Sequence, residues 1–193
     1  MEEFGARFLQ AFIPLFVAID PIALVAIFIT LGAPVDERRR RCEGNLGLLT
    51  GLAISIGFIF LGQAIFKALG ITVGDFQVAG GLILLGLAVR ELLDLGGENR
   101  PAGEAFGVVP LGMPLIAGPA LLTALLLLVD TVGITMTIVA LVVNLALVSL
   151  AFRNADRLAR LLGKRGLNGA SKLISLLLAA IAVSLIRRGW QMP

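Results

Sequence analysis

The chain has no histidine, and its single cysteine is Cys42. These absences remove the side chains that zinc and haem sites commonly use. They also exclude Ser–His and Cys–His pairs as catalytic nucleophiles, and one cysteine cannot form a disulfide within the chain. We therefore expect no enzyme, no cofactor and no metal site.

Charged side chains are scarce as well. They make up 15% of the residues, against 58% hydrophobic residues and a mean hydropathy of +0.99. A soluble domain carries about 25% charged residues, so this chain lacks the material for a surface in water. Its apolar residues form stretches close to the ~20 residues that cross a bilayer. The predicted spans are Phe8–Gly32, Leu46–Leu69, Val73–Leu93, Ala105–Val129, Val132–Phe152 and Leu173–Trp190. The sequence thus predicts an all-α integral membrane protein with one transmembrane domain, residues 1–193.

The positions of the basic residues predict how these spans cross the membrane. Most of the sixteen lysines and arginines fall between spans one and two, three and four, and five and six, beginning with Arg38–Arg41. Basic loops stay in the cytoplasm, so we expect both termini outside. Membrane lipid is the expected surrounding, and nothing in the charge pattern indicates nucleic acid.

Two spans are interrupted near their middle, at Ile19-Asp20-Pro21 and at Ala117-Gly118-Pro119. Proline removes a backbone donor inside a helix, but its fixed φ suits the first position of a new helix. Each of these spans therefore reads as two half-helices, the second beginning at Pro21 or Pro119. Interrupted spans in corresponding positions of two halves are typical of a transporter's binding site.

The two halves of the chain resemble each other weakly. Pro14 precedes the first break and Pro114 the second, while Asn45 and Asn144 follow the breaks at similar distances. We divide the chain into repeat one, residues 4–96, a cytoplasmic linker, 97–104, and repeat two, 105–193. Three spans per repeat place the second copy upside down, which predicts two inverted three-helix repeats with discontinuous first and fourth helices.

The breaks also indicate what is bound. Each frees backbone N–H groups at the start of a half-helix, and such positive helix ends suit a carboxylate. Asp20 is the only acid predicted deep inside a span, which makes it the candidate for contact with a substrate amine or for proton coupling. The predicted substrate is a small zwitterion. The candidate residues are Asp20, Pro21, Ile22, Ala23, Ala117, Gly118, Pro119, Ala120 and Thr123. Asn45 and Asn144 are second-tier candidates, because such side chains commonly join membrane helices.

Other interpretations stay open at this point. A proline in a membrane helix is often only a kink, and Asp20 can serve merely as a helix cap. The alternative to a transporter is a membrane scaffold or assembly factor that transports nothing. An intramembrane enzyme acting on lipid ranks last, because a second deep carboxylate is missing. The sequence leaves the coupling ion, a proton or sodium, and a homo-oligomeric state undecided.

The residues around both breaks resemble the MarC/SnatA family of integral membrane proteins. The resemblance lies in Val109–Pro119, in Asp20-Pro21-Ile22 with the arginine cluster, and in the glycine-containing stretch Phe76–Gly81, and its most specific part is Ala117-Gly118-Pro119. This resemblance covers nearly the whole chain. It implies the same six spans in inverted repeats within a prokaryotic inner membrane, and transport of small neutral amino acids.

The chain departs from the family's pattern directly after each proline. Where the family usually continues with glycine, asparagine and a second proline, this chain has Ala23, Leu24 and Ala26, and Ala120 replaces another usual glycine. The added methyl groups narrow the space for close backbone approach. Transport of glycine or alanine therefore does not simply carry over to this chain, and a different or more apolar substrate stays open.

Overall fold

The computed structural model describes residues 2–93, 105–155, 157, 176 and 179–191. The linker predicted at 97–104 lies outside these residues. The described part is helical and contains no strand. Its elements are α1 (Glu2–Ile19), α2 (Pro21–Gly32), α3 (Glu37–Leu69), α4 (Val73–Leu92), η1 (Gly107–Ile116), α5 (Pro119–Val132) and α6 (Ile134–Arg153). A last helix covers residues 179–191 and is called the C-terminal helix below.

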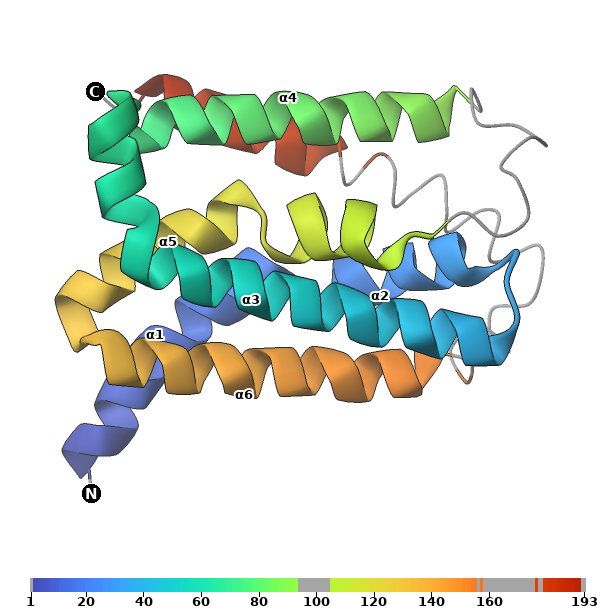
Figure 1. Cartoon of the computed structure of the whole chain (residues 1–193), viewed down its shortest axis with the longest axis horizontal. Coiled ribbons are helices and arrows are strands. Elements are labelled where there is room, and N and C mark those ends of the chain that lie inside the picture. The colour runs from blue at the N-terminus through green and yellow to red at the C-terminus, as the bar shows by residue number, and fades with distance from the viewer. Residues whose placement is uncertain (1, 94–104, 156, 158–175, 177–178, 192–193) are drawn as a thin grey trace.

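Most helices run along the long axis of the molecule, whereas α1, α5 and the last turns of α3 run obliquely to it (Figure 1). α4 and the C-terminal helix form an outer layer on one side, η1 lies between this layer and α3, and α6 lies on the opposite side of α3. Small residues bring the outer pair together, since a Cβ on Gly81 would meet the Ala182 carbonyl at 2.8 Å. Both termini lie at one end of the molecule, and the α2–α3 connection lies at the other.

Large apolar side chains cover much of the outer surface. Val17 is 70% exposed, Leu49 65% and Leu127 62%, although each belongs to an apolar helix. Large apolar side chains exposed on several helices are unusual for a soluble monomer, whereas lipid accommodates them. Within the described residues, three helical lengths could each cross a membrane: Glu3–Gly32, Glu37–Leu69 and Ile134–Arg153. The bent pair of η1 and α5 makes a fourth if it counts as one span.

Both predicted half-helices begin at the proline from which they were predicted. α2 starts at Pro21 and α5 at Pro119, each with the proline in the first turn. The segment before the second break is different from the ordinary half-helix that we expected. η1 has wide turns, with Val109 and Met113 in extended conformations. Each precedes a proline, which disfavours helical backbone in the residue before it.

Candidate functional site

Both breaks line one cavity of about 60 Å³ near the middle of the molecule. The first break contributes Asp20 and Ala23, and the second contributes Gly118, Pro119 and Ala120. The remaining lining is apolar and comes from α1, α2, α4, η1 and the C-terminal helix: Ala18, Ile19, Leu24, Ile27, Leu84, Pro114, Leu115, Ile181 and Leu185. Five of the predicted site residues, nearly a hundred positions apart in sequence, thus meet at one place.

At the first break, most backbone N–H and C=O groups find hydrogen-bond partners within the break itself. Asp20 adopts a left-handed conformation, with φ 48° and ψ 70°, and its N–H still donates to the Phe16 carbonyl at 3.0 Å. Its Oδ1 accepts from the Ala23 N–H at 3.2 Å, and its carbonyl accepts from the Leu24 N–H at 3.0 Å. Because proline has no N–H, the first turn of α2 leaves one donor open, that of Ile22. The half-buried Asp20 carboxylate is therefore both a cap and a wall of the cavity.

The second break is more open. Gly118 is extended, with φ −86° and ψ 167°, and no side chain in the described part of the chain caps α5. The Leu122 N–H donates to the Gly118 carbonyl at 3.0 Å, so the N–H groups of Ala120 and Leu121 are the open donors of this first turn. The axes of η1 and α5 meet at an angle of 52°. The sharp bend therefore exposes a helix amino end beside the cavity, with its partial positive charge.

A third element, α4, closes against the second break. A Cβ added to Gly80 would overlap Pro119 Cγ, so only glycine lets α4 lie this close. One turn earlier, the buried Gln77 donates from Nε2 to Thr123 Oγ1 at 3.5 Å, while its Oε1 has no partner in the described structure. Sequence reasoning noted this stretch only as a family resemblance and did not assign Gln77 or Gly80 to the site.

The other predicted residues lie around the cavity without lining it. Pro21 and Ala117 are buried beside it, and Thr123 is buried further along α5. The Ile22 side chain is 80% exposed and points away from the core, so only its backbone N–H bears on the site.

The two second-tier asparagines lie away from the cavity. Asn144 is fully buried and donates to the Phe12 carbonyl at 3.2 Å, which joins α6 to α1. Asn45 is exposed near the start of α3, at the end of the molecule that contains the α2–α3 connection.

Glu43 is the acid that sequence reasoning missed. Asp20 was expected to be the only deep acid, because the second span was predicted to begin at Leu46. α3 instead begins at Glu37, and Glu43 lies within it, 8% exposed. Its Oε2 accepts from the N–H groups of Phe106 at 2.9 Å and Gly107 at 2.6 Å, where η1 begins. The signal was present in Asp36, whose side chain caps α3, since such a residue ahead of a helical run marks a helix start.

The family model for MarC family integral membrane proteins matches residues 5–192. The chain belongs to the MarC family. It is 29% identical to the inner membrane protein YhgN of Escherichia coli over 189 residues, which cover 95% of this chain and 96% of YhgN. It is 28% identical to a membrane protein of Methanocaldococcus jannaschii over 194 residues, covering 94% and 95% of the two chains. No solved structure matches it.

Among the residues that the structure describes, no three acidic or cysteine side chains cluster as metal ligands would. The cavity is lined by one carboxylate, that of Asp20, and by the uncapped start of α5 within an apolar wall. This combination can bind and orient a charged small molecule. The MarC match and the exposed apolar helices together identify an integral membrane protein.

Proposed function

We propose that this MarC protein is a secondary transporter for a small neutral amino acid or a similar zwitterion. The observation that carries the proposal is the shared cavity, with the Asp20 carboxylate from one break and the uncapped start of α5 from the other. Opposite charges at two sides of an apolar space match the two charges of a zwitterion. The substrate carboxylate would lie at the Ala120 and Leu121 N–H groups, and its ammonium group at Asp20.

The size of the cavity supports a small substrate. A water molecule needs ~10–15 Å³ measured in this way, and pockets for drug-sized ligands measure ~300–1,000 Å³. The 60 Å³ space lies well below that range and suits a ligand of a few non-hydrogen atoms. The methyl groups of Ala23 and Ala120 both contribute to its wall. A substrate bound here loses its water shell, so the two charged contacts would determine its orientation.

The proposal includes six spans in two inverted repeats that expose the cavity to either side in turn. The position of both termini at one end of the molecule supports an even number of spans (Figure 1). The relatives named as inner membrane proteins support the bacterial inner membrane as the location. The arginines at the start of α3 would then face the cytoplasm, with both termini outside.

The test of transport is uptake of radiolabelled amino acids into proteoliposomes, with and without a proton or sodium gradient. Asp20→Asn keeps the cap oxygen and removes the charge, so we expect flux to fall at least tenfold. Asp36→Asn is the matched control, because Asp36 also caps a helix, α3, but lies outside the cavity. Asp36→Asn should leave flux unchanged.

A second pair of variants tests the space rather than the charge. Ala120→Leu fills the cavity and should abolish flux, whereas Ala146→Leu adds the same bulk to an exposed position on α6. Folded Asp20→Asn and Ala120→Leu proteins that keep full flux would overturn the site. If the unaltered protein moves no zwitterion and instead copurifies with a partner, the scaffold interpretation takes its place.

The orientation has its own test in Cys42, the only cysteine of the chain, which is exposed near the start of α3. A membrane-impermeant maleimide should label it in inverted vesicles and leave it unlabelled in intact spheroplasts. The reverse pattern would place the termini in the cytoplasm.

A further inference from the structure

A second cavity, of about 350 Å³, opens where α3 begins and α6 ends. It shares no residue with the cavity between the breaks. Four polar side chains form its rim, Arg41 and Asn45 from α3 and Ser149 and Arg153 from α6. Two phenylalanines form its floor, Phe28 and Phe152.

The two phenylalanine rings of the floor are held by close packing. The Phe28 and Phe152 rings stack with centroids 4.1 Å apart and planes 12° from parallel, and both side chains are buried. Gly44, which also lines the cavity, leaves room for these rings, because a Cβ there would come within 2.9 Å of the Phe28 ring. A larger residue at Gly44 would therefore displace the Phe28 ring. The apolar floor is fixed by helices α2, α3 and α6 together.

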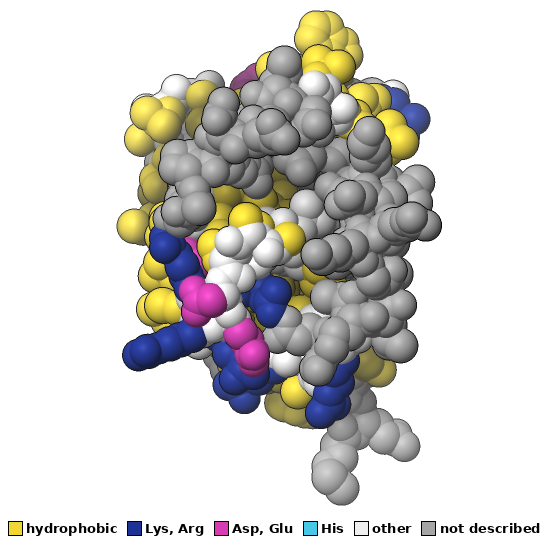
Figure 2. Space-filling view, turned by 90° about the vertical axis from the view of Figure 1, so that its right-hand side faces the viewer, with side chains coloured by type: hydrophobic (Ala, Val, Ile, Leu, Met, Phe, Trp, Pro, Cys, Tyr) yellow, Lys and Arg dark blue, Asp and Glu magenta, His cyan; other side chains and the backbone are white. Residues whose placement is uncertain are grey.

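The rim carries two positive charges from different helices. Arg41 and Arg153 are both exposed, and Arg41 also pairs with Glu37, one turn earlier on α3. No acidic side chain of the described residues lines the cavity itself. Basic and acidic side chains gather on this end of the molecule (Figure 2). The Glu37 carboxylate keeps one edge of the Arg41 guanidinium occupied, and the planar group has five donors in all.

We propose that this cavity binds a phosphate group. Guanidinium groups bind phosphate through paired, charge-assisted hydrogen bonds, and two of them can hold it from opposite sides. Asn45 and Ser149 add neutral donors to the same rim. The stacked rings suit the carbon atoms attached to the phosphate. Basic pockets between helices at the cytoplasmic face bind phospholipid headgroups, so the headgroup of an anionic lipid and a free phosphate are the two sources of this chemistry.

The experiment measures how much each probe raises the unfolding temperature of the detergent-purified full chain, since ligands that bind the native state stabilise it. The probes are dihexanoylphosphatidylglycerol, inorganic phosphate, and dihexanoylglycerol, which has the same acyl chains without phosphate. The concentration dependence of each shift gives a Kd. At least one phosphate-containing probe is expected to bind, and dihexanoylglycerol is not.

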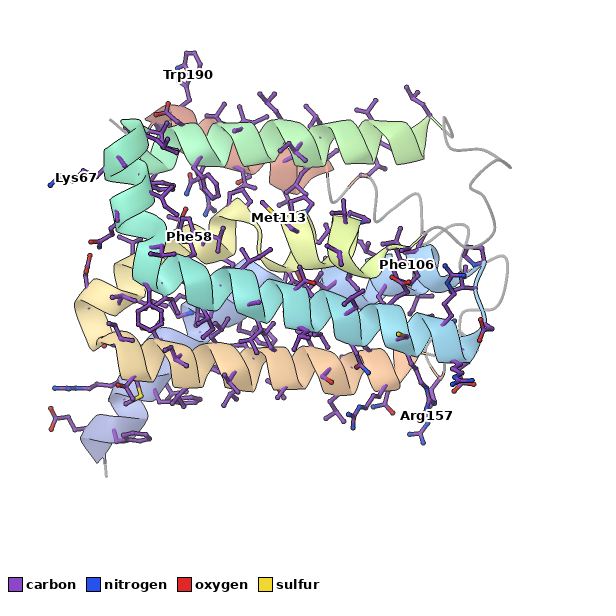
Figure 3. The ribbon with its side chains drawn as sticks, viewed as in Figure 1. Phe58, Lys67, Phe106, Met113, Arg157 and Trp190 are labelled. Carbon is purple, nitrogen blue, oxygen red and sulfur yellow. The ribbon has the colours of Figure 1, made fainter. Side chains whose placement is uncertain are left out.

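Matched variants distinguish binding at this cavity from general attraction to the positive charge at this end of the molecule. Arg41→Gln with Arg153→Gln should weaken binding about tenfold or more, because both charge-assisted contacts are lost. Arg38→Gln with Arg157→Gln removes the same charge from exposed positions at the same end, where Figure 3 shows Arg157, and should leave the Kd within about twofold. Equal weakening by both pairs would overturn the proposal, as would equal binding of dihexanoylglycerol or no binding of any phosphate probe.

A pair of variants without a change of charge tests the site independently, in case the arginine variants fail to fold. Ser149→Phe fills the cavity and should abolish binding, whereas Leu150→Phe places the same ring on an exposed neighbour and should not. Unaltered binding in a folded Ser149→Phe protein would also overturn the proposal. Binding of phosphatidylglycerol alone assigns the site to lipid, and binding of inorganic phosphate with similar affinity assigns it to a free phosphate.

Discussion

The two breaks look alike in sequence and differ in how their backbones are satisfied. At the first, Asp20 caps α2 with its own side chain and takes the left-handed conformation that the turn requires. At the second, Gly118 offers no side chain, α5 is uncapped, and the axis bends by 52°. The segment leading into the second break is instead held by Glu43, which belongs to α3. The backbone groups at the first break are thus satisfied by residues of the break itself, whereas the segment before the second break is held by a residue of another helix.

This difference indicates which break is the better anion site. A cap that a side chain already occupies has little left for a ligand, whereas the open N–H groups of Ala120 and Leu121 still need an acceptor in an apolar setting. The first break supplies the negative charge of Asp20 in return. Similar proline breaks thus take opposite electrostatic roles.

The largest expected effect on stability comes from cutting the support of the second break. Glu43→Leu leaves the buried N–H groups of Phe106 and Gly107 without their acceptor, so we expect the free energy of unfolding to fall by about 2–5 kcal/mol. Denaturant titration of the detergent-purified protein measures it. The control is Glu37→Leu on the same helix, an exposed position where the change should stay within about 0.5 kcal/mol. Equal losses of unfolding free energy in the two variants would show that the Glu43 hydrogen bonds do not stabilise the start of η1.

The next effect tests whether α4 must lie against the second break. Gly80→Ala forces α4 away from Pro119 and should destabilise the protein by about 1–3 kcal/mol, with a loss of flux. On the same helix, Gly86→Ala has open space within 4 Å and should stabilise by about 0.5–1 kcal/mol, as alanine does in helices. A stabilising Gly80→Ala would mean that α4 does not pack there.

A smaller effect is expected from the cap of the first break. Asp20→Ala loses the acceptor for the Ala23 N–H and places alanine in a left-handed conformation, which costs about 1–2 kcal/mol. Asp20→Gly tolerates the conformation and should cost only a few tenths of a kcal/mol. Thermal unfolding measures both losses, and a large loss for Asp20→Gly as well would show that the acid stabilises the fold through contacts other than the cap.

The smallest effect concerns selectivity at the two breaks. Ala23→Gly and Ala120→Gly each remove one methyl group from the cavity wall. Each should improve the apparent affinity for a substrate larger by one methylene about three- to fivefold, since burying one methylene contributes ~0.8 kcal/mol. Competition assays in proteoliposomes measure this. An effect of only one of the variants would show which break contacts the substrate's side chain.

Much of the helical layout follows from composition and proline alone. The starts of α2 and α5 were predicted at Pro21 and Pro119 because proline permits few other backbone arrangements there. The start of α3 was predicted nine residues late, because hydropathy does not register the polar turns that extend a helix beyond its apolar core. The irregular η1 was missed for a related reason, since the effect of two prolines four residues apart depends on their neighbours.

The candidate site was only partly predictable. Asp20 and Gly118 were found because each lies directly beside a proline break. Gln77, Gly80 and Glu43 come from helices without a break, and only the packing of α3 and α4 brings them to this region. Such long-range contacts leave no periodic signal in a single sequence.

The Glu43 hydrogen bonds also indicate which segments of the protein would move together. Two hydrogen bonds join the beginning of η1 to α3, so we expect these two segments to move as one rigid body. A rearrangement that opens the second break then has to swivel α5 relative to that body, about a hinge at Ala117 and Gly118. At the first break, α1 is joined to α6 by the hydrogen bond from Asn144 to the Phe12 carbonyl, and the α1–α2 pair forms one apolar length, Glu3–Gly32. For the transport proposed above, we therefore expect the hinge at the second break, on one side of the cavity, while the α1–α2 pair on the other side stays in place.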